Sequence, residues 1–99
     1  MNEIITTLRI VANYSQERDP QMSAEEHANL ATIHAIRVQA LREAEALLNW
    51  QQTLATSGLD PAFTLEAAAL QFREWVRDQV RAQTFGSVEY QAWDYIRQL

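Results

Sequence analysis

Apolar side chains recur at helical spacing along most of the chain, and the longest such pattern runs from Ser23 to Ser57. When this segment is aligned on a seven-residue repeat, residues seven positions apart fall in the same column. Two adjacent columns together are mostly apolar, and a third column flanks them. The columns are Leu30, Arg37, Ala44 and Gln51; then Ile33, Ala40, Leu47 and Leu54; then His34, Leu41, Leu48 and Ala55. The pattern predicts one helix over about residues 24–57, with a broad apolar face that packs along other helices.

Residues at both ends of this segment support the prediction. Ser23 and Glu26 form a capping box, and Gly58 can adopt the left-handed conformation that ends many helices. About 33 helical residues span roughly 50 Å, whereas a compact domain of this size is only about 30–35 Å across. We therefore expect the helix to overhang a compact monomer, to kink near Asn49–Gln51, or to run along a second subunit.

Shorter apolar stripes predict three further helices, over about residues 2–16, 64–84 and 88–98. Turn residues separate them, with Pro20 and Pro61 in two of the connections and Gly86-Ser87 in the third. The predicted fold is all-α, a single domain of residues 1–99 with four helices in the order short, long, long, short. It is built on an antiparallel hairpin of the two long helices. A small helical chain buries a limited core, so we expect a homo-oligomer, with a dimer favoured.

Two polar residues, Arg37 and Gln51, interrupt the apolar face of the long helix. Either each lays its apolar stem on the core with its polar head at the rim, or the two set a register or meet a carboxylate on a partner. Together with Leu41 and Leu48, they form the predicted oligomer interface.

The last predicted helix carries apolar residues on two sides. Val88, Ala92 and Ile96 belong to one stripe, and the second consists of Tyr90, Trp93 and Arg97. Tyr, Trp and Arg dominate binding hot spots, so this second stripe is a candidate partner-binding surface. The alternative is that the helix is wedged between two others and both stripes belong to the core.

A row of arginines, Arg73, Arg77 and Arg81, follows one side of the third predicted helix. Such a row can grip phosphate or carboxylate groups. However, Glu74 and Asp78 each lie three residues before an arginine, and these pairs favour a solvated surface whose charges compensate one another.

Composition narrows the classes of function. The net charge is −5, all eight basic residues are Arg, and there is no Cys. A spread negative charge disfavours nucleic-acid binding. The chain has neither the apolar run needed to cross a membrane nor the start of a signal peptide, so we expect a cytoplasmic protein with no membrane partner.

No catalytic motif is present in the sequence. His27 and His34 are seven residues apart, about 10 Å along a helix, which is too far for one metal ion without other ligands. Glu43 and Glu45 point to different sides of their helix. We therefore expect no enzyme activity, no cofactor and no metal site.

A small, acidic, cysteine-free helical chain resembles several bacterial and phage proteins as a class. These include phage-encoded inhibitors of host defence, anti-CRISPR proteins among them, as well as anti-activators and secretion chaperones. The lack of catalytic motifs, the second stripe at Tyr90, Trp93 and Arg97, and the overlong helix predict a protein that regulates or inhibits a partner by occupying its surface. The alternatives are a structural homo-oligomeric subunit of a larger assembly and a small helical chaperone or adaptor.

Overall fold

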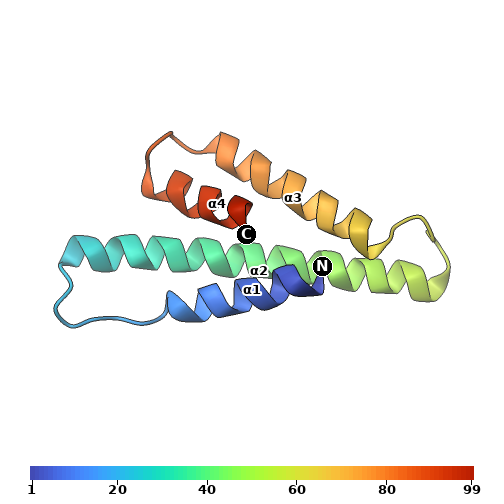
Figure 1. Ribbon diagram of the computed structural model, residues 1–99, viewed down its shortest axis with the longest axis horizontal. Helices are drawn as coiled ribbons and strands as arrows, with labels where there is room; N and C mark the ends of the chain where they lie inside the picture. The colour runs from blue at the N-terminus through green and yellow to red at the C-terminus, as the bar shows by residue number, and fades with distance from the viewer.

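The computed structural model describes residues 1–99 and is all-helical, with α1 (Asn2–Tyr14), α2 (Ala24–Ser57), α3 (Leu65–Ala82) and α4 (Val88–Gln98). α2 is the central element; α1 lies along one side of it, and α4 lies between α2 and α3 (Figure 1). The molecule measures 53 × 26 × 15 Å. The 34 residues of α2 span about 51 Å at ~1.5 Å per residue, so this one helix sets the long dimension.

α2 is continuous from Ala24 to Ser57, without a break near Asn49–Gln51. At its start, the Ser23 hydroxyl accepts a hydrogen bond from the Glu26 N–H at 3.1 Å and donates one to the Glu26 carboxylate at 3.2 Å. At its end, Gly58 has a φ of 70°, the left-handed conformation expected there. The residues Ser23 and Gly58 therefore define the two ends of the long helix, and no Gly or Pro lies between them.

Two of the predicted helices are shorter in the structure. α1 ends at Tyr14, because the Gln16 N–H bonds to Asn13 three residues back and the chain leaves the α-helical pattern. α3 begins after Thr64, whose hydroxyl accepts from the Ala67 N–H at 3.1 Å and so acts as the N-cap. At the other end of α3, Gln83 is already extended.

One hydrophobic core joins all four helices. Its α2 members Ala40, Ala44 and Leu47 lie on the predicted inward face, whereas Ile36 lies outside the predicted columns. α1, α3 and α4 each contribute apolar residues at helical spacing. The core residues are Ile5, Leu8, Ile36, Ala40, Ala44, Leu47, Phe72, Val76, Val80, Ala92, Trp93 and Ile96. The apolar face of α2 is thus covered by helices of the same chain.

Small side chains allow α2 to serve as this common support. Ala40 and Ala44 are both completely inaccessible to solvent. A fully covered alanine leaves no room for a longer side chain in a close-packed interior. The middle of α2 is therefore where its neighbours press most closely on it.

α4 is held between α2 and α3 by aromatic contacts. The ring of Trp93 meets that of Trp75 edge-on, with centroids 5.3 Å apart, and Trp75 in turn lies 6.0 Å from Phe72. Aromatic pairs of this kind add about 0.5–1.5 kcal/mol beyond the area they bury. Trp93 therefore fixes α4 in the core.

Polar side chains of α2 bind the C-terminal end of α1. Arg37 donates to the carbonyl of Val11 at 3.0 Å, and His34 Nδ1 lies 3.1 Å from the carbonyl of Ala12 and 2.7 Å from the Ser15 hydroxyl. The last carbonyls of a helix lack intrahelical donors and favour a positive charge. Because the last turn of α1 contains no basic residue of its own, α2 supplies the charge.

The closeness of packing around α2 is testable with a matched pair of substitutions. Ala40→Leu adds volume at a fully covered site and should lower the free energy of unfolding by about 1–3 kcal/mol. Ala46→Leu makes the same change at an exposed position of α2, and its effect should stay within about 0.5 kcal/mol. Urea denaturation followed by circular dichroism measures both. Equal effects at the two positions would mean that α2 is not enclosed at Ala40.

Candidate interaction surfaces

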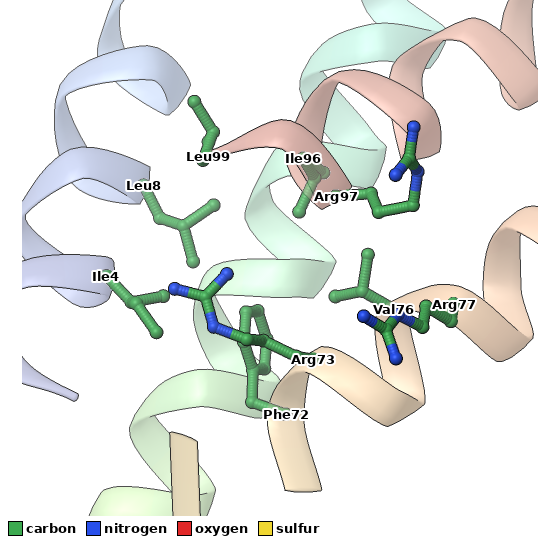
Figure 2. Close-up of a pocket in the computed structure, with 9 residues that line it drawn as sticks. All are labelled: Ile4, Leu8, Phe72, Arg73, Val76, Arg77, Ile96, Arg97 and Leu99. Carbon is green, nitrogen blue, oxygen red and sulfur yellow. The ribbon is translucent and has the colours of Figure 1, made fainter. Parts of the chain in front are cut away.

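A cleft opens where α1, α3 and α4 converge. Figure 2 shows its lining, which is apolar in depth and carries three arginine side chains. It is lined by Ile4, Leu8, Phe72, Arg73, Val76, Arg77, Ile96, Arg97 and Leu99. The cleft exists because α1 and α3 flank the C-terminal end of α4 without closing over it.

The cleft is small. Its volume is about 60 Å³, whereas one water needs about 10–15 Å³ by the same kind of measure. Phe72 and Val76, which form part of its wall, are 3% and 1% exposed. A space of this size and polarity suits one aliphatic side chain better than a drug-sized ligand.

Two of the three arginines at the cleft have no acidic partner. Arg97 Nε donates to Asp94 at 2.8 Å, but no carboxylate lies within 4.0 Å of Arg73 or Arg77. In Figure 2, the Arg73 side chain extends from α3 towards the α1 side of the cleft. Arg97 is therefore the one arginine of the cleft that is paired with a carboxylate, in a chain whose net charge is −5.

The arginine row of α3 divides into two parts. Arg81 pairs with Asp78 at 3.6 Å, as the sequence spacing predicts, and both side chains are exposed. The corresponding pair of Glu74 and Arg77 is not formed. The prediction of self-compensating charges is confirmed at the C-terminal end of the row and is wrong for Arg77.

The residues predicted to bind a partner do not share one exposed surface. Trp93 is 2% exposed and belongs to the core, and the half-buried Tyr90 packs against Phe85 with ring centroids 5.0 Å apart. Only Arg97 of this set lies at the cleft. The wedged alternative accounts for Trp93, because α4 contacts both α2 and α3.

The residues predicted to form an oligomer interface are used inside the chain. Gln51 is 9% exposed, and Leu41 and Leu48 are half-buried against the core. Besides its bond to α1, the Arg37 guanidinium lies 4.9 Å from the ring centroid of Tyr95, and its Nε atom is buried without a hydrogen-bond partner. Arg37, Leu41 and Leu48 therefore contact other helices of the same chain, and Gln51 is buried within it.

A second surface lies at the end of the molecule formed by residues 49–70, which we call the distal end. Figure 1 shows that α1 and α4 stop short of this end, where α3 alone accompanies α2. Four large apolar side chains are exposed here, namely Trp50 at 57%, Leu59 at 77%, Leu65 at 43% and Leu70 at 57%. The other exposed apolar side chains include Ile10 and Tyr14 on α1.

The histidines take structural positions. His34 binds the end of α1, and His27 Nε2 lies 3.0 Å from the carbonyl of Asp19 in the preceding loop. No group of three or more His, Asp or Glu side chains is arranged to hold a metal ion. No helix combines the length and apolar character needed to cross a membrane.

The sequence contained signals for part of the cleft but not for its existence. Leu8, Phe72 and Val76 belong to the apolar stripes that predict α1 and α3, and the row of arginines on α3 is visible in the sequence. These residues line one cleft because of the angle at which α4 enters between α3 and α2. No local sequence pattern encodes that angle.

Comparisons with family models, with curated proteins and with solved structures find no match to this chain.

The internal role of the predicted oligomer interface gives a direct test. Leu41→Glu places a carboxylate against the core and should lower the free energy of unfolding by roughly 2–3 kcal/mol, whatever the protein concentration. Thermal melts at several concentrations measure this, with the exposed neighbour Arg42→Glu as the control. If Leu41→Glu instead gave a monomer with the wild-type melting temperature from a dimeric parent, Leu41 would belong to an interface between chains.

Proposed function

We propose that this protein is a helical interaction module that regulates or inhibits a partner protein in the cytoplasm by occupying part of its surface. The observation that carries the proposal is the distal end, where large apolar side chains project beyond the part of the molecule enclosed by all four helices. Surfaces of this composition are typical of protein–protein contacts, and Trp is among the residues that contribute most to them.

The shape of the molecule supports this proposal. A slab only 15 Å thick and 53 Å long presents much surface for its size. The distal end is also amphipathic, because Asn49, Gln52, Thr53, Thr56 and Ser57 form a polar surface on α2 beside the exposed apolar residues. A polar surface next to apolar anchors matches the organisation of specific interfaces, in which an apolar centre is bordered by a polar rim.

A structural homo-oligomer has less support. The side chains that suggested it, Arg37, Leu41, Leu48 and Gln51, are already engaged within one chain. The class resemblance to small phage-encoded inhibitors agrees with the proposal but supplies no partner and no contact residue.

The proposal is tested by affinity capture from bacterial lysate with the full chain as bait. Trp50→Ala/Leu70→Ala should remain folded and should lose the captured partner, because truncating one hot-spot residue costs about 2 kcal/mol or more, roughly thirtyfold in affinity. Quantitative mass spectrometry compares this variant with the wild type.

The matched control is Ile10→Ala/Tyr14→Ala, which removes equally exposed apolar side chains from α1. This control should retain the partner. Capture that survives the distal substitutions unchanged, or is lost equally in the control, would contradict a binding role for the distal end.

A further inference from the structure

We propose that the cleft between α1, α3 and α4 binds an acidic segment of the partner protein. One aliphatic side chain of that segment enters the cleft, and its neighbouring carboxylates bind Arg73 and Arg77. This inference rests on the proposed function and adds a second contact, of defined chemistry, next to the distal end on α3.

The apolar wall of the cleft determines which kind of partner side chain can enter it. The wall formed by Ile4, Leu8, Phe72, Val76 and Ile96 offers no hydrogen-bonding side chain to an occupant. Its volume of about 60 Å³ accommodates a side chain such as Val, Leu or Ile. Burying one such side chain contributes about tenfold or more in affinity.

The arginines of the site favour acidic residues on either side of the aliphatic side chain that enters the cleft. A guanidinium group binds a carboxylate through two parallel hydrogen bonds, and Arg73 and Arg77 have no internal carboxylate to make them with. They are four residues apart on α3, so their Cβ atoms are about 6 Å apart. Two acidic residues on one face of a helix, or at alternate positions of an extended segment, have similar spacing.

Charge also decides between kinds of partner. The chain carries a net charge of −5, which opposes approach to a nucleic acid or to an anionic bilayer. A short acidic segment needs to reach only the cleft, where Arg73 and Arg77 have no carboxylate within 4.0 Å. The remaining negative charge then disfavours any other mode of docking by the same segment, which gives the contact a single orientation.

The experiment uses a phage-displayed library of random short peptides, selected against the full chain. Enriched peptides should combine one aliphatic residue with two or more Asp or Glu. The tightest of them, labelled with a fluorophore, is then titrated with the wild type and with each variant, and its binding is read by fluorescence anisotropy.

Three variants distinguish the two halves of the site. Arg73→Gln/Arg77→Gln should weaken binding by about tenfold or more, and Val76→Ile, which adds one methyl group to the wall of the cleft and keeps the arginines, should also weaken it. Arg81→Gln is the matched control, because Arg81 lies on the same helix but outside the cleft and is paired with Asp78. It should change the dissociation constant by less than about twofold. Circular dichroism confirms that each variant is folded.

Several results would overturn the inference. These are the absence of enriched peptides, enriched peptides without acidic residues, or equal binding to the wild type and to Arg73→Gln/Arg77→Gln. Phosphatidylserine vesicles are tested in parallel. Vesicle binding that depends on Arg73 and Arg77, without an enriched peptide, would assign the cleft to an anionic lipid instead.

The native partner separates this inference from the proposed function. Capture that requires Trp50 and Leu70 but is unaffected by Arg73→Gln/Arg77→Gln would support the proposed interaction module and would contradict binding of an acidic segment in the cleft. Capture lost in both variants supports both contacts.

Discussion

The structure depends on one constraint: a continuous helix of 34 residues must have its apolar stripe covered along most of its length. No single short helix can do this, since α1 has 13 residues, α3 has 18 and α4 has 11. The chain meets the constraint by placing the three helices on adjoining parts of α2, with α4 inserted under α3 (Figure 1). The fully covered Ala40 and Ala44 lie in the middle of the stripe, where this enclosure is tightest.

Both candidate surfaces are consequences of this arrangement. Inserting α4 between α2 and α3 leaves the end of α4 beside α1 and α3, and the cleft forms where the three do not close. Beyond the cleft, α2 and α3 extend past the shorter helices, and Trp50 and Leu70 remain exposed. The side chains available for binding therefore lie where the helices that cover α2 end. Trp93 on α4, although of a residue type common in binding hot spots, is buried in the core.

The elements were predictable from the sequence because they depend on local chemistry. Ser23 and Gly58 mark the two ends of α2, as the sequence predicts. The partner of Arg37 could not be predicted, because an arginine on an apolar face has the same sequence signature whether it caps a neighbouring helix or contacts another chain. Its partner, the Val11 carbonyl, lies 26 residues away. Long-range placement of this kind, like the entry of α4, has no local signal.

The central claim is that helices of the same chain cover α2. Amide hydrogen exchange along α2, measured by NMR at two protein concentrations, tests it most directly. The amides of residues 36–47 should exchange only by global unfolding, to the same extent at both concentrations, while those of residues 53–57 should exchange faster through local opening. Protection of residues 36–47 that rises with protein concentration, or a gap of rapid exchange that divides α2 in two, would contradict it.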